Sequence, residues 1–225
     1  IYNDMIYIAD TYSHKIKKIS ITGQCNGFVI NSRFSSPHAI AVNSNYIFVG
    51  YAGTYVTVRL HNGSVIRDHY LGSHVRYSWG MSVNGAGNKL AIADYNQNRI
   101  HEYSISGSNL SYSRSSNSSY SSSTGYFRRP TDTAYDSSGN IYVSDLYNHR
   151  VQKLNSSMVY QGKVGSYSTT TGFRYPYGLT IDSNDKIYAT DFYNYAVRQY
   201  DTSLSETATY GGGAGTRLSA AKKVI

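Results

Sequence analysis

The sequence predicts an all-β fold of repeated antiparallel sheets, and two observations carry this prediction. One phrase recurs about five times, as IYIADTYSHKIKKI, IFVGYAGTYVTVRL, LAIADYNQNRIHEY, IYVSDLYNHRVQKL and IYATDFYNYAVRQY. The starts of the copies lie roughly 40 to 50 residues apart, a period typical of one supersecondary unit repeated in a ring or solenoid. Within each copy, apolar residues alternate on both sides of a short polar turn, which indicates two antiparallel strands joined by a hairpin.

A second recurring element supplies the strand that precedes most copies. It reads FSSPHAIAV from Phe34, FRRPTDTAY from Phe127 and FRYPYGLTI from Phe173, with the variant YSWGMSV from Tyr77. The proline stands where the strand begins, a position at which a sheet tolerates a missing N–H donor. A more polar strand, such as SSMVYQGKV or SETATYGG, follows most copies. Four strands in each repeat of this length predict a β-propeller of four-stranded antiparallel blades.

The order F-x-x-P, I-Y-x-x-D and N-x-R-[VI] resembles the NHL repeat. The fullest copy is FRRPTDTAYDSSGNIYVSDLYNHRVQKL, residues 127–154, and the resemblance continues in register over nearly the whole chain. The second copy departs most from the pattern, because Tyr51 replaces the repeated aspartate and Val56 replaces the basic residue. We therefore expect one NHL-like propeller domain over residues 1–225.

The two ends of the chain fit one another. Joined as AAKKVI and IYNDMIYIAD, they align without a gap to PYGLTIDSNDKIYATD. We expect residues 222–225 to form the innermost strand of the blade that begins near Met5, which closes a ring of five blades by a shared "velcro" blade. The alternatives are part of a six-bladed ring, which is more common among NHL propellers, and pairing of strand 222–225 with a neighbouring molecule. Such self-association would build a larger or filamentous assembly.

Composition favours an extracellular or cell-surface protein. The chain contains 25 tyrosines, and serine, asparagine and glycine are plentiful. Alternating tyrosine suits strands, because the ring packs while the hydroxyl stays in water. No apolar run is long enough to span a membrane. The serine-rich segment 104–126 is expected to be part strand and part long loop.

Four N-x-[ST] sequons lie in expected outer-strand turns or in the serine-rich segment. These are exposed positions that a glycan could occupy, so we expect a glycoprotein. The candidate positions are Asn62, Asn109, Asn117 and Asn155.

The formal net charge of +8 favours an anionic partner. The basic residues are spread along the chain, without a long basic run or an arginine-rich arm. Some animal NHL domains bind RNA on one face, but this pattern favours a solvated basic surface or an acidic polysaccharide over nucleic acid.

Aspartates end the second strand in four of the five copies. A carboxylate at this point can accept hydrogen bonds from the N–H groups of the following turn. Recurrence from blade to blade is what a structural role predicts and a single catalytic site does not. The aspartates are Asp10, Asp94, Asp145 and Asp191, and the basic residues Lys15, Arg99 and Arg150 follow on the hairpins, where they could pair with the aspartates or face a ligand.

The peptidyl-amidating lyase, a propeller related to NHL repeats, offers the best comparison with an enzyme. Its P-H-x-[IL] elements place zinc-binding histidines around the central channel, and FSSPHAIAV puts His38 at such a position. A single imidazole cannot make a catalytic zinc site, which usually has three protein ligands. We therefore expect no catalytic residue, metal site or cofactor, with a channel calcium ion held by backbone oxygens as an open option. The positions matched to His38 in the other copies are Gly80, Thr131, Tyr177 and Ala221.

The leading hypothesis is an extracellular, non-enzymatic binding or scaffold propeller, glycosylated and repeated within a larger assembly or fibril. Its partner would be a protein or a glycan bound on the hairpin face, although fold analogy alone does not name a ligand. A channel-centred, metal-dependent lyase or hydrolase and a single-stranded RNA-binding NHL domain are the alternatives. The candidate residues of the binding face are Tyr12, Arg99, Tyr147, His149, Arg150 and Tyr193.

Overall fold

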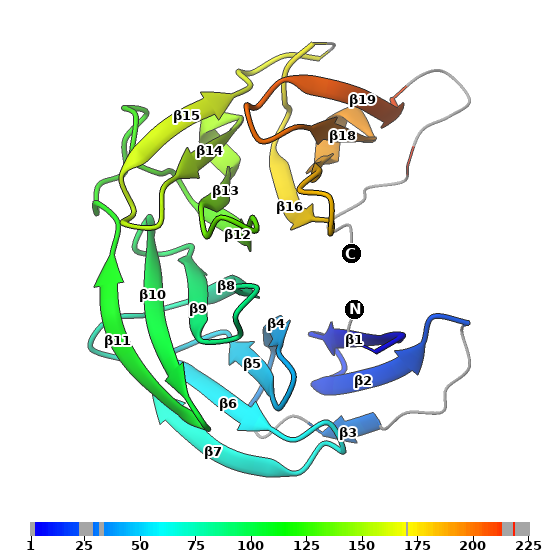
Figure 1. Ribbon diagram of the computed structural model, residues 1–225, viewed down its shortest axis with the longest axis vertical. Coiled ribbons are helices and arrows are strands. Elements are labelled where there is room, and N and C mark those ends of the chain that lie inside the picture. Colours follow the sequence, from blue (N-terminus) through cyan, green and yellow to red (C-terminus); the bar gives the residue numbers. More distant parts are fainter. Residues whose placement is uncertain (1–2, 23–28, 32–33, 170, 213–217, 219–225) are drawn as a thin grey trace.

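The repeated sheets follow one another along an arc, with one strand of each four-stranded sheet at the inner side (Figure 1). The computed structural model describes residues 3–22, 29–31, 34–169, 171–212 and 218. The described residues form five antiparallel sheets, and in each of them strands that follow one another in sequence are hydrogen-bonded neighbours. The fold is therefore a β-propeller arrangement of four-stranded blades.

The strands have the following bounds. The N-terminal sheet contains β1 (Met5–Asp10), β2 (Lys15–Ser20) and β3 (Val29–Asn31). The first blade contains β4 (Pro37–Val42), β5 (Ile47–Tyr51), β6 (Tyr55–Arg59) and β7 (Val65–Tyr70). The next contains β8 (Ser78–Val83), β9 (Lys89–Asp94), β10 (Arg99–Ser106) and β11 (Asn109–Ser115). The third contains β12 (Pro130–Tyr135), β13 (Ile141–Asp145), β14 (Arg150–Leu154) and β15 (Tyr160–Val164). The last contains β16 (Pro176–Ile181), β17 (Ile187–Asp191), β18 (Ala196–Tyr200) and β19 (Glu206–Gly211).

The number of complete blades differs from the prediction. The structure has four four-stranded blades, so the prediction of five is wrong. The N-terminal sheet has three strands because its first strand, β1, corresponds to the second strand of the other blades. Within the described residues, no segment lies beside β1 as an innermost strand. Residues 222–225, which were expected to supply it, lie outside the described part of the chain.

The prolines lie where the sequence predicted, at the beginning of the innermost strands. Pro37, Pro130 and Pro176 are the first residues of β4, β12 and β16. The register with the second strand shifts directly after each of them, and it shifts in the same way after Ser78 in β8. This β-bulge is shared by the four blades. It turns the side chain that follows the proline position toward the space between the inner strands.

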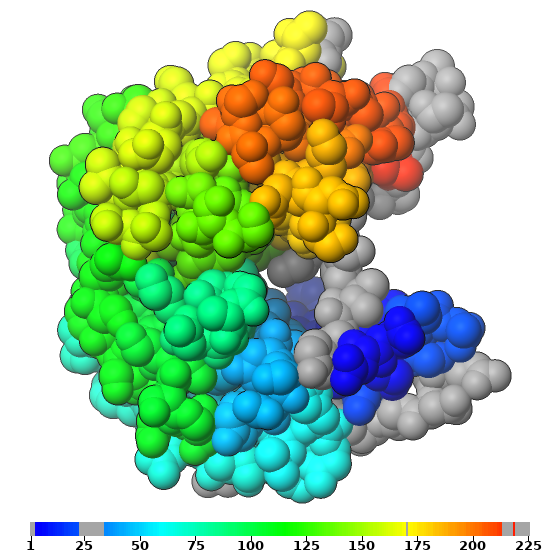
Figure 2. All heavy atoms as spheres, viewed as in Figure 1, coloured from blue at the N-terminus to red at the C-terminus, as the bar shows by residue number. Residues whose placement is uncertain are grey.

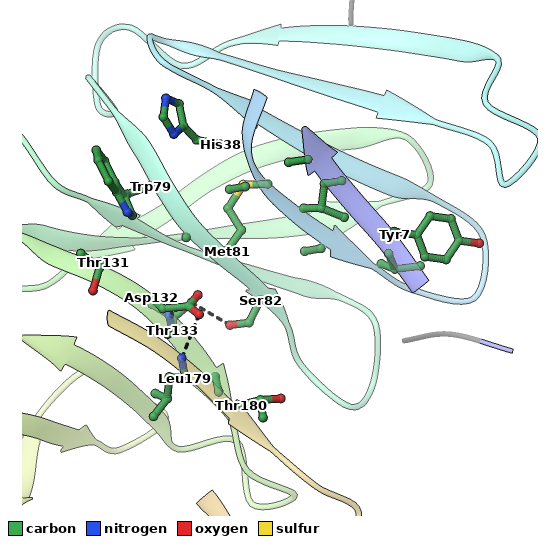
Figure 3. A pocket seen from close by; sticks show the side chains of 18 of the residues that line it. Tyr7, His38, Trp79, Met81, Ser82, Thr131, Asp132, Thr133, Leu179 and Thr180 are labelled. Carbon is green, nitrogen blue, oxygen red and sulfur yellow. Dashed lines mark hydrogen bonds between the residues drawn. The ribbon is translucent and has the colours of Figure 1, made fainter. Parts of the chain in front are cut away.

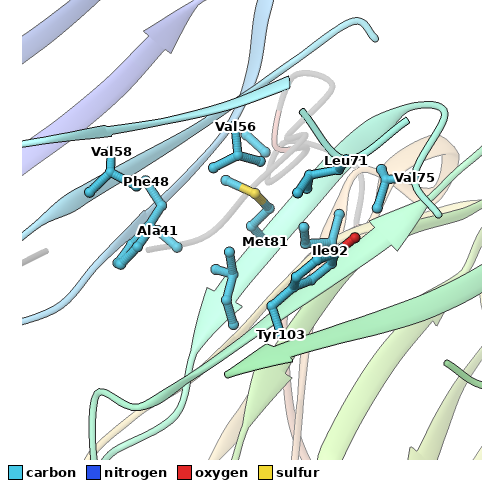
Figure 4. Close-up of a cluster of buried hydrophobic side chains, with 11 residues drawn as sticks. Ala41, Phe48, Val56, Val58, Leu71, Val75, Met81, Ile92 and Tyr103 are labelled. Atoms are coloured by element: carbon cyan, nitrogen blue, oxygen red, sulfur yellow. The ribbon is translucent and has the colours of Figure 1, made fainter. Parts of the chain in front are cut away.

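The hydrophobic core lies between neighbouring blades. Figure 4 shows one such cluster, in which Phe48 and Val58 of the first blade pack with Met81, Ile92 and Tyr103 of the next. All five side chains are buried. Burial of a large apolar side chain contributes roughly 1.5 to 3 kcal/mol, so the contacts between blades hold the arc together.

A hydrogen bond between turns also links neighbouring sheets. The residue that ends a hairpin turn accepts a bond from the backbone N–H of the residue that precedes the proline position of the next blade. These residues all have left-handed backbone conformations, with φ between 53° and 63°. The bonds run from Ser36 N to His14 Nδ1 at 2.8 Å, from Arg129 N to Asn98 Oδ1 at 3.0 Å and from Tyr175 N to His149 Nδ1 at 3.2 Å. We call them the turn-to-turn bonds.

The only helical segments among the described residues are two short 3-10 turns. They are η1 (Leu146–Asn148) and η2 (Phe192–Asn194), each directly after the aspartate that ends a second strand. Neither is long or apolar enough to cross a membrane.

Candidate functional site: an aromatic cavity at the turn face

The turn face is the end of the propeller that carries the prolines and the hairpins between second and third strands. Three aspartates lie just beneath it, and their side chains are fully buried. Each accepts a hydrogen bond from the backbone N–H of the arginine two residues before the innermost strand of its blade. These bonds join Arg76 to Asp94 at 2.6 Å, Arg128 to Asp145 at 2.7 Å and Arg174 to Asp191 at 2.6 Å. The carboxylates therefore tie two turns of one blade together.

Side chains complete the shell around each carboxylate. Asp145 accepts bonds from Arg150 Nε at 2.8 Å and Gln152 Nε2 at 3.0 Å. Asp191 accepts a bond from Arg198 Nε at 2.9 Å. Near Asp94 the corresponding side chain is His101, whose Nε2 lies 3.7 Å from the carboxylate. The partner thus comes from the first or the third residue of the third strand of the blade, because alternate residues of a strand face the same side.

Two of the basic residues that the sequence offers as partners of the aspartates, Lys15 and Arg99, do not pair with them. Asp10 is partly exposed and pairs with Lys17 at 2.5 Å instead of Lys15. The hydrogen bond from Lys17 lowers the pKa of Asp10. Arg99 makes a long contact of 3.5 Å to Ser115 Oγ and does not reach Asp94.

Arg150 was predicted on the binding face, and this prediction is wrong. Its side chain is buried, and its guanidinium donates to the carbonyl oxygens of Ser122, Ser123 and Tyr126 as well as to Asp145. Arg150 therefore fixes the serine-rich segment to its blade. Part of that segment is strand β11, and the rest runs on to Tyr126.

A cavity of about 580 Å³ lies among the inner strands β4, β8, β12 and β16, with β1 at one side. Figure 2 shows the hollow that the blades surround, and Figure 3 shows its walls. The polar groups of the wall are paired with one another. Ser82 and Thr133 share a hydrogen bond of 2.8 Å, and Asp132 accepts the backbone N–H of Leu179 at 3.0 Å. These bonds join neighbouring inner strands.

The residue after the proline position lines this cavity in each of the four-stranded blades. Three of these residues, His38, Trp79 and Thr131, are labelled in Figure 3. In the β8–β11 blade this residue is Trp79, whereas the sequence alignment had matched Gly80 to His38. Ser78 pairs with Asp94 as each proline pairs with the last residue of its second strand, so Ser78 holds the proline position and Trp79 follows it. A Cβ at Gly80 would lie 2.5 Å from Asp132 Oδ1. The mouth residues are therefore His38, Trp79, Thr131 and Tyr177, and Ala221 lies outside the described residues.

These mouth residues lack the donor set of a zinc site. His38 stacks on Trp79 at 5.2 Å and shares a hydrogen bond of 2.9 Å between its Nε2 and the Tyr77 hydroxyl. Burial lowers the pKa of His38. Across the described residues, no three histidine, cysteine, aspartate or glutamate side chains gather closely enough to hold a metal ion. The calcium ion in the channel stays a prediction.

A second cavity, of about 560 Å³, opens on the turn face beside the channel mouth. Seven aromatic rings line it, together with Leu146 and Arg174. We call it the aromatic cavity. Its rings come from three consecutive blades and are Trp79, Tyr95, Tyr147, Tyr175, Tyr177, Phe192 and Tyr193.

The seven rings form a continuous chain of contacts. Going round from Tyr95, the centroid distances are 4.6 Å to Trp79, 6.0 Å on to Tyr177, 5.8 Å to Phe192, 4.9 Å to Tyr193, 5.3 Å to Tyr175 and 5.6 Å to Tyr147. Burial raises the pKa of Tyr95, and the neighbouring Tyr147 hydroxyl raises it further. Burial also raises the pKa of Tyr177 to about 12. Such contacts between aromatic rings are favourable and hold the wall in place before any ligand arrives.

The rim of the aromatic cavity is cationic. The Arg129 guanidinium lies 4.7 Å from the centre of the Tyr95 ring, and the Arg174 guanidinium lies 5.4 Å from that of Tyr193. Arg129 also donates to Asn96 Oδ1 at 2.8 Å. The Nε of Arg174 is buried and has no hydrogen-bond partner among the described residues.

The predicted binding-face residues fall into different places. Tyr147 and Tyr193 line the aromatic cavity and are 40% and 46% exposed. His149 touches its edge through Tyr175, at 4.5 Å between ring centres. Tyr12 is 93% exposed and belongs to the channel cavity instead.

Sequence reasoning missed the other five rings of the aromatic cavity. A signal was present, because an aromatic residue follows the aspartate within two positions in Tyr95, Tyr147 and Phe192. An aromatic residue also directly follows the proline position in two blades, as Trp79 and Tyr177. The candidate sequons lie on outer turns and strands, where Asn62, Asn109 and Asn117 are exposed and Asn155 is half-buried with its Oδ1 accepting two backbone N–H groups.

Comparison with known proteins assigns the class of this fold. The family model described as "NHL repeat" matches residues 127–154, the same segment that carries the fullest resemblance, so the NHL prediction is confirmed. The chain is thus a β-propeller that contains an NHL repeat. No curated protein matches it.

Solved structures share the fold at low sequence identity. A chain of the crystal structure of the nidogen/laminin complex is 18% identical with a TM-score of 0.73, over 99% of this chain and 83% of that one. Virginiamycin B lyase from Staphylococcus aureus, as a catalytically inactive variant with quinupristin, is 12% identical with a TM-score of 0.72, over 99% and 71%. A protein of unknown function from Bacteroides caccae is 10% identical with a TM-score of 0.66, over 90% and 71%.

Proposed function

We propose that this protein is a non-enzymatic binding propeller whose partner docks on the turn face at the aromatic cavity. The observation that carries the proposal is the continuous chain of seven aromatic rings that lines a cavity of about 560 Å³. Ligand sites are typically concave, apolar and largely formed in advance, with a few polar groups that orient the ligand. Here Arg129 and Arg174 are those polar groups.

Two further features support binding over chemistry. The ionisable groups beneath the turn face are paired with one another and point inward, as Asp145 and Arg150 do. At the channel mouth, the positions equivalent to His38 carry Trp79, Thr131 and Tyr177, which are side chains for contact and not for metal coordination. The nidogen/laminin complex shows that a similar fold occurs in a protein–protein assembly.

The proposal extends to location and modification. An extracellular or cell-surface protein would carry glycans at the exposed Asn62, Asn109 and Asn117, all on outer turns and strands away from the aromatic cavity. Expression in a glycosylating secretory host, followed by glycosidase treatment, should lower the apparent mass. An unchanged mass would remove this part of the proposal. Self-association through residues 222–225 is part of the same proposal. Its test compares the oligomeric state of the full chain with that of a chain that ends at residue 218, which should lose the association.

Binding arrays test the proposal as a whole. The protein is applied to one array of immobilised glycans and one of tiled peptides, beside the variants Tyr193→Ala and Tyr70→Ala. Tyr193 lines the aromatic cavity, whereas Tyr70 is an exposed tyrosine of the outer strand β7. We expect at least one bound feature that Tyr193→Ala loses and Tyr70→Ala keeps. Absence of binding on both arrays, or binding that Tyr193→Ala leaves unchanged, would overturn the proposal.

A further inference from the structure

The walls of the aromatic cavity restrict the kind of ligand that it can take. Its rings are flat apolar surfaces, but they stay partly in water, since Tyr147 and Tyr193 are 40% and 46% exposed. A pyranose ring has the matching form, with C–H groups on its faces and hydroxyl groups on its edges. The C–H groups meet the electron-rich faces of the aromatic rings, and the hydroxyl groups remain solvated.

The rim selects the charge of the ligand. Arg129 and Arg174 stand over two separate rings of the wall, and the buried Nε of Arg174 has no hydrogen-bond partner in the described part of the chain. The aspartates beneath the turn face do not neutralise the rim, because they are buried and bonded inward. A guanidinium binds a carboxylate or a sulfate through two parallel N–H bonds. A cationic ligand, which an aromatic cage otherwise attracts, is repelled by these two arginines.

The position of the aromatic cavity favours a ligand with more than one unit. Trp79 and Tyr177 line this cavity and the channel cavity alike, so the two spaces adjoin at the channel mouth. A ligand bound among the rings can continue past Thr131 toward the channel.

We propose that the aromatic cavity binds an anionic oligosaccharide, with sugar rings on Trp79 and the tyrosines and acidic groups on Arg174 and Arg129. This inference rests on the proposed binding function and adds the class of ligand. Single-stranded RNA fits less well, because RNA-binding sites combine stacking with a basic groove that follows the phosphates, whereas this rim presents the two arginines Arg129 and Arg174. An anchoring side chain of a partner protein fits less well, because such side chains bind in fully desolvated pockets, whereas Tyr147 and Tyr193 stay partly in water.

Intrinsic fluorescence gives a direct readout, because Trp79 is the only tryptophan of the chain. The protein is titrated with three tetrasaccharides, which are tetragalacturonic acid, a sulfated heparin fragment and neutral chitotetraose, and with a uridine decanucleotide. Calorimetry of each titration gives the dissociation constant independently of the emission. We expect saturable binding of the galacturonate or the sulfated probe, with chitotetraose at least tenfold weaker, because it cannot engage the arginines. Tighter binding of tetragalacturonic acid would identify carboxylate as the acidic group, whereas tighter binding of the heparin probe, which carries carboxylates as well, would show that sulfate adds to the affinity.

Matched variants separate the site from the overall charge. Arg174→Gln and Arg67→Gln remove the same charge, but Arg67 is exposed on β7, outside the aromatic cavity. We expect Arg174→Gln to weaken binding of the anionic probe about tenfold and Arg67→Gln to change it by less than about twofold. Tyr193→Ala and Tyr70→Ala form the corresponding pair for stacking. Thermal unfolding of every variant confirms that it is folded.

The outcomes distinguish the ligand class from the binding function. Equal losses in Arg174→Gln and Arg67→Gln, or equal affinity for chitotetraose, would overturn the anionic oligosaccharide. So would preferred binding of the decanucleotide or of an array peptide at the same rings, although the binding function would then stand. If no probe and no array feature binds, the proposed function is overturned together with this inference.

Discussion

The turn face has two layers that follow the repeat differently. In the lower layer, Asp94, Asp145 and Asp191 are all fully buried and accept equivalent backbone bonds in three successive blades, whereas the β4–β7 blade has Tyr51 at this position. In the upper layer the side chains change from blade to blade, and only three blades contribute rings to the aromatic cavity. Residues that recur in a repeat serve the structure that every blade needs. Residues that depart from the repeat are free to form one specific site, so the comparison separates scaffold from function.

The largest expected effect concerns the lower layer. In Asp145→Ala, the buried guanidinium of Arg150 loses its carboxylate, and the N–H of Arg128 loses its acceptor. Removal of one member of a buried ion pair typically costs about 3 to 5 kcal/mol. We expect a loss of this size in the free energy of unfolding, measured by urea denaturation.

Asp10→Ala is the matched control for that variant. Asp10 occupies the equivalent position of the N-terminal sheet, but its pair with Lys17 is partly exposed to solvent. We expect its effect on stability to be much smaller. Similar losses in the two variants would contradict the view that burial gives the recurring aspartates their structural role.

The next largest effect concerns the close packing of the inner strands β8 and β12 beside the aromatic cavity. A Cβ at Gly80 would overlap the backbone of Thr131 and lie 2.5 Å from Asp132 Oδ1. We expect Gly80→Ala to lower the free energy of unfolding by about 1 to 3 kcal/mol, because a tightly packed contact has to open. Gly85→Ala, with no atom within 4 Å of its new Cβ, should change it by less than about 0.5 kcal/mol. Equal values for both glycines would show that β8 and β12 tolerate a wider spacing.

A smaller, pH-dependent effect concerns the turn-to-turn bonds. His149 Nδ1 accepts the N–H of Tyr175, and burial lowers the pKa of His149. Since the folded protein disfavours the protonated form, this contribution is complete above the unfolded pKa of about 6.5 and is lost as the pH falls through the lower folded value. His149→Asn keeps an acceptor, as Asn98 does at the equivalent position, and removes the titration.

Unfolding free energies at pH 8 and pH 5 test this bond. We expect the loss on acidification to be smaller in His149→Asn than in the original protein. Burial lowers the pKa of His38 and His101 as well, so both proteins retain part of the acid sensitivity. An identical loss in the two proteins would show that His149 does not titrate in this range.

The smallest expected effect on stability belongs to the upper layer. Tyr193 is half-exposed, and Tyr193→Ala removes its contacts with Tyr175 and Phe192 at the rim. We expect a loss of about 1 kcal/mol in the free energy of unfolding, with a large loss of binding. If stability falls as far as in Asp145→Ala, the division into scaffold and site does not hold.

Much of the scaffold could be predicted from sequence because it repeats. The alternation of apolar residues located the hairpins, and Pro37, Pro130 and Pro176 located the beginnings of inner strands. The side-chain partners of the aspartates were harder to predict, because a hairpin strand presents alternate residues to one face. The first and the third residue of that strand can therefore both reach the carboxylate, and in the β8–β11 blade His101 lies near Asp94 whereas Arg99 contacts Ser115.

The site could be predicted only in part, since it depends on features that do not repeat. Ser78 stands where the other blades have proline, so the mouth position of that blade belongs to Trp79 and not to Gly80. Tyr147 and Tyr193 were found from their hairpins. Their assembly with Tyr95, from a separate blade, depends on how three blades pack. Such contacts between blades leave no periodic signal in a single sequence.

The most direct test of the account is the emission of Trp79 during titration with the tighter-binding of the two anionic probes, tetragalacturonic acid and the heparin tetrasaccharide. The account predicts a saturable change in the original protein and in Tyr70→Ala, and a titration weakened at least tenfold in Tyr193→Ala. Binding that leaves the Trp79 emission unchanged, or that Tyr193→Ala does not weaken, would contradict the assignment of the aromatic cavity as the binding site.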